Sequence, residues 1–469
     1  MTIFVLGAGP SGLAIVDGII DDKVDDFIVL EKSKSIGGLA QTVHWDKIGY
    51  HDLGPHKIFS QDKKLTKRVE DLLPSQKWLT REKISSVFMN KYFLPYPPSP
   101  FSLGKVFGIK IFINMCIGYG IAMLKNLLSK AKPDTFEEDL IRRLGSPLYN
   151  VLFKPIAVKL WGDPKTLDVK LSQGRVQTPS LIEVFSKSLG FNKNSEFEAL
   201  TFRYPINGLS EIWKSIEIKS KNHGKFLLEH NISGFKVANN RIIEIKSTYD
   251  GNEVTHKVNE NDFVVTSLPL GITIPLLLDN LESNTQNLLD EVVHLNDLLL
   301  IFLHIDKPKF LDESWVFVPD PSIVFHRISE QESFDPNMIN NGSVVCCEIM
   351  SSKDRKMIDK SDEELFKLTE EGLKNMGYSD FNIKSQRIIK LPKSYPVFKK
   401  GYEPGLKEIL KRLDKFQNFK TIGRQGAFNY IGTLDAMDIG YGFINWYKQR
   451  KLLPWQDERN RTSLYPVLD

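Results

Sequence analysis

The stretch FVLGAGPSGLAIVD, from Phe4 to Asp17, decides the fold of this 469-residue chain. An apolar run precedes three glycines in the spacing G-x-G-x-x-G, and a second apolar run, Leu13 to Ile20, follows them. The pattern predicts a buried parallel strand, a tight turn and a helix that begins at the third glycine. Such a turn lets the backbone approach a pyrophosphate, whose charge faces the helix N-terminus. The residues expected to hold it are Gly7, Gly9, Pro10, Ser11 and Gly12.

A second strand pattern, Phe27 to Leu30, ends in Glu31. An acid at this position accepts hydrogen bonds from the ribose hydroxyls and repels the 2′-phosphate of NADP. The order strand, turn, helix, strand and acid therefore indicates a dinucleotide site. We include Lys32, the next residue, in that site.

The pair Gly37-Gly38 follows in EKSKSIGGLAQT. This continuation resembles the fingerprint of the glutathione-reductase-like FAD fold, in which the glycines and a small polar residue approach the pyrophosphate and ribitol. GYGIAM and GYGFIN both lack the third glycine of a second nucleotide motif. The sequence thus favours FAD over NAD and predicts no nicotinamide domain. The further FAD contacts expected are Gly38, Leu39, Ala40 and Thr42.

Charge and cysteine content narrow the function classes. Lysine and arginine number 62 against 58 acidic residues, and a net charge of +4 is too small to indicate a nucleic-acid partner. Cys116, Cys346 and Cys347 show no metal-ligand spacing, so we expect reduced thiols, no metal and a cytoplasmic location. A cleaved leader is not expected, because the first strand begins by Ile3.

One apolar segment, Ile109 to Leu124, is interrupted by Lys110, Asn114 and two glycines, and no stretch reaches about 18 apolar residues. We expect a buried helix here rather than a transmembrane span. The alternative is a hydrophobic lip at a substrate entrance or at a membrane surface, so peripheral membrane contact stays open.

The order of patterns predicts an α/β protein with a discontinuous, glutathione-reductase-like FAD-binding Rossmann domain. Residues 1–75, 216–270 and 416–469 form the three expected pieces of this domain, the second of which contains an antiparallel meander. A mostly helical insertion is expected at 76–215. A substrate domain with a mixed sheet and helices is expected at 271–415.

Several motifs place this order of segments in a known superfamily. Besides the fingerprint they are HDLGPHKIF (His51 to Phe59), VFMNKYFLPYP, LFKPIAVKLWGDPKTL, FRYPINGLSEIW and IGRQGAFNYIGTLDAM. The chain resembles the FAD-dependent amine oxidase and protoporphyrinogen oxidase superfamily, which includes phytoene desaturases and UDP-galactopyranose mutases. Three motifs resemble the mutase branch: GPH at 54–56, Lys-x-Trp-Gly at 159–162 and the Gly-Arg to Tyr segment at 423–430. TLDAMDIGYG then replaces the tyrosine- and asparagine-rich sequence of that branch.

The resemblance implies further cofactor contacts. Gly54, Pro55 and His56 would lie beside the isoalloxazine, and Gly423 and Arg424 would form a turn against it. A final helix is expected near Ala436, with its N-terminus at the flavin O2, where reduced flavin carries negative charge. The remaining contacts expected are Asp435, which alternatively only caps the helix, the backbone of Met437, and the backbone of Ile232 against the adenine.

The catalytic candidates implied by the same motifs are His56, Trp161, Arg203, Arg424 and Tyr430. Four of the five have a plainer alternative: a structural histidine for His56, a core tryptophan for Trp161, an ordinary salt bridge for Arg203 and a surface arginine for Arg424. Because none of the cysteines lies near the Arg424 turn, we expect FAD to be noncovalent.

The leading interpretation is an FAD-dependent oxidoreductase of the amine oxidase or protoporphyrinogen oxidase type, which takes a hydride from a small molecule through flavin N5. The alternative is a non-redox UDP-sugar pyranose/furanose mutase that uses reduced flavin. A fold-related binding protein without a redox role is a third interpretation, against which Glu31 and Gly37-Gly38 argue.

Overall fold

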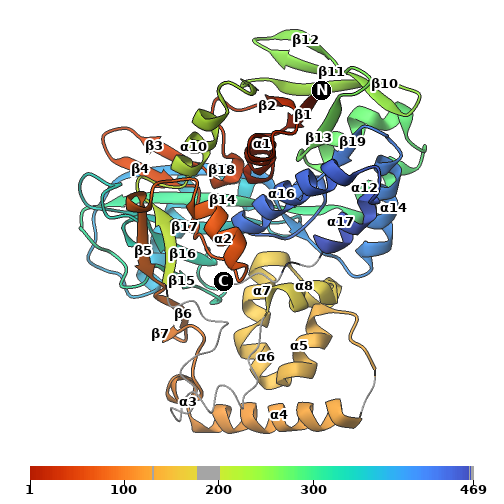
Figure 1. The fold of residues 1–469 in the computed structure, drawn as a ribbon. Coiled ribbons are helices and arrows are strands. Elements are labelled where there is room, and N and C mark those ends of the chain that lie inside the picture. Colours follow the sequence, from red (N-terminus) through yellow and green to blue (C-terminus); the bar gives the residue numbers. More distant parts are fainter. Residues whose placement is uncertain (129–130, 177–200, 464, 466–469) are drawn as a thin grey trace.

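A five-stranded parallel sheet organises the computed structural model, which describes residues 1–128, 131–176, 201–463 and 465 (Figure 1). Alternate side chains of its first strand enter two different cores, with Ile3 in one and Phe4 in the other. A run that is apolar at every position therefore forms a strand here, because both faces of the sheet are covered. In sheet order the strands are β19 (Phe419–Thr421), β13 (Phe263–Thr266), β1 (Thr2–Leu6), β2 (Asp26–Leu30) and β9 (Gly224–Leu227).

These strands come from three separated parts of the chain, which confirms the discontinuous Rossmann fold. The boundaries of the five pieces stay a prediction, and residues 177–200 of the expected insertion lie outside the described residues. A separate antiparallel meander is formed by β10 (Asn231–Ala238), β11 (Arg241–Tyr249) and β12 (Asn252–Lys257).

Two helices lie together beside the parallel sheet, α1 (Pro10–Asp22) and α16 (Thr433–Gln449) (Figure 1). A Cβ at Gly440 would lie 2.3 Å from the carbonyl oxygen of Ser11, so only glycine permits this approach. The end of the chain is thereby held against the residues that follow β1.

The second large sheet is mixed and has seven strands. Its interior strand β17 is buried at every position, and only the pairing of β15 with β6 is parallel. In sheet order the strands are β18 (Ile383–Val397), β14 (His294–Ile305), β17 (Ser343–Ser351), β16 (Arg327–Glu330), β15 (Trp315–Phe317), β6 (Ser85–Met89) and β7 (Tyr92–Pro95). Two further antiparallel pairs form separate two-stranded sheets: β3 (Thr42–Trp45) with β4 (Gly49–Asp52), and β5 (Trp78–Glu82) with β8 (Thr201–Pro205).

Six consecutive helices form a helical insertion that projects from the two sheets (Figure 1). They are α3 (Pro100–Phe107), α4 (Ile109–Leu128), α5 (Phe136–Leu144), α6 (Ser146–Leu152), α7 (Lys154–Trp161) and α8 (Val169–Arg175). The other helices are α2 (Lys63–Glu70), α10 (Ser210–Ser220), α11 (Leu270–Thr273), α12 (Thr285–Val292), α13 (Asp362–Asn375), α14 (Tyr402–Asp414), α15 (Gly423–Gly426) and α17 (Trp455–Arg461).

The expectation that the apolar segment forms a buried helix is wrong. Only Met115 and Ala122 of α4 are buried, and 11% of its most apolar window lies inside the protein. With 20 residues and a mean hydropathy of 1.5 over that window, α4 is the one helix among the described residues whose length and composition would suffice to cross a membrane.

Candidate functional site

The glycine loop after β1 adopts the conformation that a pyrophosphate requires. Gly7 has φ +100°, and a Cβ on Gly12 would lie 2.1 Å from the carbonyl oxygen of Gly7, so strand and helix approach only with glycine at both positions. Gly9 has ordinary extended dihedral angles, and a Cβ there would meet no atom within 4 Å. The open space at Gly9 is the cradle in which the sequence places the pyrophosphate.

Two other predicted glycines border this loop. A Cβ on Gly38 would lie 3.1 Å from Cα of Gly9, and one on Gly423 would lie 3.1 Å from Oγ of Ser11. The N-terminal fingerprint, the glycine pair and the C-terminal turn therefore meet at one place. Pro10 begins α1, and Leu39 and Ala40 follow Gly38 in a short 3-10 turn.

The predicted ribose acid is fixed in position by the backbone. Oε2 of Glu31 accepts the N–H of Ala8 at 2.8 Å, and Oε1 accepts the N–H of Ser33 at 2.9 Å. Each oxygen keeps a lone pair for a ribose hydroxyl. Ile232 lies on β10, an edge strand of the meander, and Lys32 is exposed.

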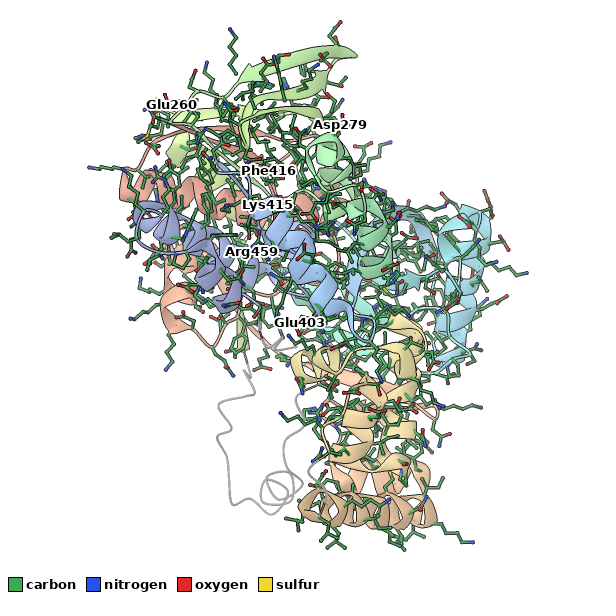
Figure 2. The ribbon with its side chains drawn as sticks, turned by 90° about the vertical axis from the view of Figure 1, so that its right-hand side faces the viewer. Glu260, Asp279, Glu403, Lys415, Phe416 and Arg459 are labelled. Atoms are coloured by element: carbon green, nitrogen blue, oxygen red, sulfur yellow. The ribbon has the colours of Figure 1, made fainter. Side chains whose placement is uncertain are left out.

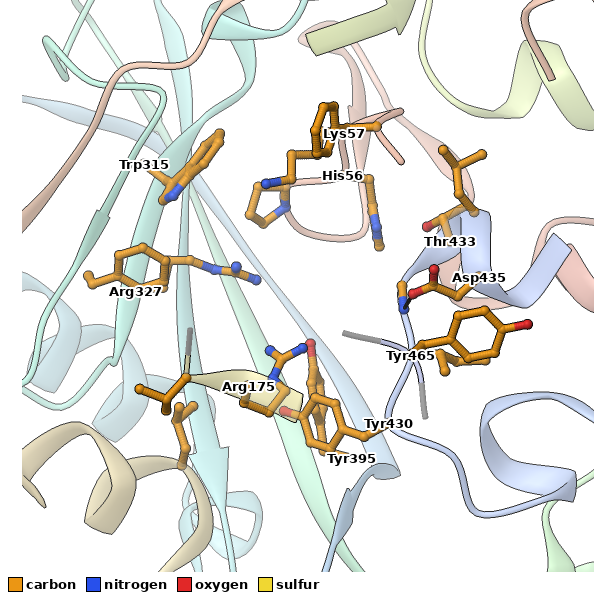
Figure 3. A pocket seen from close by; sticks show the side chains of 18 of the residues that line it. His56, Lys57, Arg175, Trp315, Arg327, Tyr395, Tyr430, Thr433, Asp435 and Tyr465 are labelled. Carbon is orange, nitrogen blue, oxygen red and sulfur yellow. Dashed lines mark hydrogen bonds between the residues drawn. The ribbon is translucent and has the colours of Figure 1, made fainter. Parts of the chain in front are cut away.

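A cavity of about 510 Å³ extends from the N-terminus of α16 to the helical insertion and the second sheet (Figure 3). Four of the five catalytic candidates line it: His56, Trp161, Arg424 and Tyr430. Pro55 and Asp435 line it as well. The structure thus brings together side chains from residues 55 to 435 at the expected flavin end of the glycine loop.

His56 is a neutral group in this cavity. Its Nε2 lies 3.2 Å from the carbonyl oxygen of Leu53, and because a carbonyl only accepts, Nε2 carries the hydrogen. Burial lowers the pKa of His56 to about 4, and the charges of Arg424 and Arg327 act in the same direction. At neutral pH the ring is therefore uncharged.

The final helix begins three residues earlier than the sequence predicted, at Thr433 rather than near Ala436. Oδ2 of Asp435 accepts the N–H of Gly432 at 2.9 Å, so this carboxylate caps the helix. The first N–H groups, at Thr433 and Leu434, have no acceptor within the helix, and both residues line the cavity. Met437 lies in the second turn of α16 with its side chain fully buried, and its role as a backbone contact stays a prediction.

Arg203 lies apart from the other four catalytic candidates. It is on β8, its Nε is 3.2 Å from Oε1 of Glu70, and it is not among the described residues that line the cavity. This contact is the ordinary salt bridge that the sequence left open as the alternative. The hydroxyl of Thr42 makes hydrogen bonds within the protein. It donates to Oδ1 of Asp52 at 2.6 Å and accepts the N–H of Ser210 at 3.1 Å.

The sequence missed several cations and tyrosines of the cavity. Arg175, at the end of α8, lies over the ring of Tyr430 with 4.3 Å from its guanidinium carbon to the ring centre. Arg327, on β16, pairs with the buried Glu348. Figure 3 shows the guanidinium groups of both arginines directed into the same space, with Tyr395 beside Tyr430. Lys57 also lines the cavity.

Two buried polar atoms at the cavity wall have no hydrogen-bond partner among the described residues. They are Nε1 of Trp161 and Nδ1 of His326. Because buried polar groups are normally paired, a molecule or water bound in the cavity would find hydrogen-bonding groups at these two positions. The donor set and the Gly9 cradle together fit an FAD with a substrate beside its ring.

Fold and site define a dinucleotide-binding protein of the Rossmann type with a second, substrate-facing sheet. No family model matches the chain. The crystal structure of reduced UDP-galactopyranose mutase is similar over 96% of this chain and 94% of that one, at 16% identity and a TM-score of 0.82. A protein from Exiguobacterium sp. 255-15, provisionally named protoporphyrinogen oxidase, is similar over 96% and 99%, at 14% identity and a TM-score of 0.72.

Cyclohexylamine oxidase from Brevibacterium oxydans IH-35A is similar over 96% of this chain and 99% of that one, at 12% identity and a TM-score of 0.63. The chain therefore has the fold of the FAD-dependent amine oxidase superfamily, as its motifs predicted. At these identities the likeness concerns the fold.

Proposed function

We propose that the protein is a flavoenzyme that binds one FAD noncovalently and acts on a small anionic substrate of the sugar-diphosphate class. The observation that carries this proposal is the convergence of Arg175, Arg327, Arg424 and Lys57 on one cavity. Guanidinium groups bind phosphate through charge-assisted, bidentate hydrogen bonds, which are the strong ones available to a protein. The structural similarity to UDP-galactopyranose mutase supports a nucleotide sugar as the substrate.

This proposal changes the preference drawn from the sequence. The sequence favoured the oxidoreductase because TLDAMDIGYG replaces the tyrosine-rich segment of the mutase branch and because the apolar Ile109 to Leu124 segment would suit the entry of an apolar substrate; it offered Arg203 and Arg424 as candidate anion ligands. Arg203 lies elsewhere, but three other cations from α8, β16 and the segment after Pro55 line the cavity. A diphosphate would accept charge-assisted hydrogen bonds from these cations, whereas an apolar substrate would accept none.

Different residues of the chain would contact the flavin and the substrate. Bound flavin supplies the reactive N5, and the protein supplies orientation and electrostatics. The N–H groups at the start of α16 face the flavin end and stabilise negative charge there. Neutral His56 offers hydrogen bonding without adding positive charge, and Tyr395 and Tyr430 offer hydroxyl groups to the substrate.

A second candidate function is hydride removal from a small molecule by an FAD-dependent oxidoreductase. One observation favours it: apolar side chains line the part of the cavity next to the helical insertion, namely Leu152, Phe153, Ile156 and Leu160. Such a wall suits an apolar substrate that needs no phosphate clamp.

Binding of UDP and UDP-sugars, followed by flavin fluorescence in the oxidised and dithionite-reduced protein, tests the proposal. We expect binding that Arg424→Ala weakens about 10- to 150-fold, the equivalent of about 1.5–3 kcal/mol for hydrogen bonds to a charged group. Arg203→Ala is the matched control, because this arginine lies outside the cavity.

Isomerisation of the sugar by the reduced protein alone, without net flavin oxidation, supports the mutase. Absence of UDP-sugar binding together with flavin bleaching by a neutral, apolar substrate would overturn the proposal in favour of the oxidoreductase.

A further inference from the structure

The outer face of α4 is an exposed apolar surface at one end of the molecule. Figure 1 places α4 at the end farthest from the parallel sheet, and Figure 2 shows its side chains projecting outward. Ile109 is 67% exposed and Leu128 is 87% exposed. Phe101 of the adjoining α3 is 83% exposed. The stripe along α4 repeats every three or four residues: Ile109, Ile113, Ile117, Ile121, Leu124 and Leu128.

The opposite face of α4 is fixed to the protein along its length. Met115 and Ala122 are buried, and a Cβ on Gly118 would lie 2.5 Å from Cδ of Pro147 in α6. Nδ2 of Asn126 donates to the carbonyl oxygen of Arg142 in α5 at 2.7 Å. The exposed stripe is therefore held rigidly outward.

This packing excludes an orientation in which α4 crosses a bilayer. A spanning α4 would carry α5 into the hydrocarbon region, and α5 contains Glu137, Glu138, Arg142 and Arg143. Charged groups in that region are costly. An orientation with α4 parallel to the bilayer surface buries the stripe and leaves α5 in water.

The positive charge around the apolar stripe favours an anionic lipid surface as its partner. From Tyr96 to Pro133 the sequence contains no aspartate or glutamate, whereas its lysines stand at 105, 110, 125, 130 and 132. The side chains of Lys105, Lys110, Lys125 and Lys132 are exposed. Lysines beside an apolar stripe extend their ammonium groups to lipid phosphates while their stems cover apolar surface.

The same charge argues against a second copy of this chain as the partner. A twofold interface built on α4 would place one lysine set against the same set of the other subunit. Like charges at such short range oppose association, whereas anionic headgroups attract every one of them.

We propose that α3 and α4 attach the protein to the surface of an anionic phospholipid bilayer, with α4 lying in the plane of the headgroups. The apolar stripe enters the boundary between headgroups and acyl chains, and the lysines contact lipid phosphates. This proposal rests on the surface of the insertion and is independent of the reaction in the cavity.

Sedimentation of the FAD-loaded protein with vesicles tests the attachment. We expect binding to phosphatidylglycerol-containing vesicles that exceeds binding to phosphatidylcholine vesicles at least tenfold and weakens with salt. Lys110→Glu and Lys125→Glu should each lower the affinity about fivefold or more, since one lysine near the surface contributes about 1 kcal/mol.

The double substitution Ile117→Asp with Leu124→Asp should abolish vesicle binding. The matched control is Ile218→Asp on α10, an isoleucine that is 65% exposed on another face. Retained FAD content and an unchanged far-ultraviolet circular dichroism spectrum show that each variant is folded.

Cys116 offers a direct probe of depth, because it is exposed on α4 whereas Cys346 and Cys347 are buried. An environment-sensitive fluorophore on Cys116 should shift to shorter wavelength with anionic vesicles and be quenched by brominated acyl chains. Equal binding to neutral and anionic vesicles, or none to either, would overturn the proposal.

Two other results would also contradict it. Resistance of bound protein to carbonate extraction would indicate a spanning helix. A dimer in solution that Ile117→Asp with Leu124→Asp dissociates, without vesicle binding, would identify the stripe as an interface between copies.

Discussion

Replacing Gly9 with valine should remove FAD while the fold stays intact. Gly9 has φ −79° and ψ 179°, a conformation open to any residue, and a Cβ there would meet no atom within 4 Å. The stability of the cofactor-free protein should therefore change by less than about 0.5 kcal/mol. The valine side chain instead occupies the space into which the pyrophosphate must fit.

Gly12→Ala is the informative contrast. Its Cβ would lie 2.1 Å from the carbonyl oxygen of Gly7 and 3.2 Å from Cγ1 of Val5, so the strand and the helix must separate. We expect this variant to lose stability even without cofactor. The two neighbouring glycines thereby distinguish a requirement for ligand space from a requirement for packing.

Flavin absorbance per polypeptide and thermal unfolding with added FAD measure both effects. A hundredfold excess of FAD over its Kd should stabilise the native protein by about 2.7 kcal/mol and leave Gly9→Val unchanged. Stoichiometric FAD in purified Gly9→Val would refute the assignment of this loop to the pyrophosphate. Equal destabilisation of the two cofactor-free variants would refute the geometric argument.

Three further predictions follow from the cofactor site and from one buried carboxyl group. Acid precipitation should release all flavin colour, because no cysteine lies near the turn at Arg424; colour in the pellet would show a covalent link. NADPH should reduce the flavin slowly in anaerobic stopped-flow experiments, since the sequence contains no second nucleotide motif, and rapid saturable bleaching at micromolar NADPH would disprove this. Burial, and then the charge of Glu330, raise the pKa of Glu332 from 4.5 to about 8, so the folded protein holds a proton that the unfolded chain has lost. The stabilisation is complete below about pH 4.5 and disappears as the pH rises through 8. The Tm should fall between pH 6 and pH 9, and Glu332→Gln should make the fall smaller; an identical pH profile in the variant would contradict the assignment.

The sequence predicted the cofactor half of the fold because local spacing determines it. The glycines at 7, 9 and 12 fall within one strand, turn and helix, and Glu31 follows the next strand, so their spacing along the chain is sufficient to identify the loop. The same local information failed for α4. Hydropathy reports that a helix is apolar, but the residues that cover it or leave it exposed lie elsewhere in the chain.

The sequence predicted the cavity residues that stand in recognisable motifs. It missed the cavity residues that only the folded chain brings together. His56, Trp161, Arg424 and Tyr430 each stand in a quoted motif. Arg175, Arg327 and Tyr395 come from α8, β16 and β18, and no spacing along the chain connects them. Arg203 stood in a motif but meets Glu70, a partner that sequence order does not reveal.

The contacts of two cavity arginines give them different parts in binding an anion. Arg327 pairs with the buried Glu348, which offsets its charge and fixes its guanidinium in place. Arg424 donates from Nε to the carbonyl oxygen of Ile431 at 3.0 Å and lies 5.2 Å from the ring centre of Tyr395. A carbonyl and an aromatic ring orient a guanidinium without neutralising it. The charge of Arg424 acts on His56, where, after burial, it helps to lower the pKa of the ring. For the anionic substrate that we propose, Arg424 would therefore contribute more electrostatic stabilisation than Arg327, and Arg327 would contribute mainly direction.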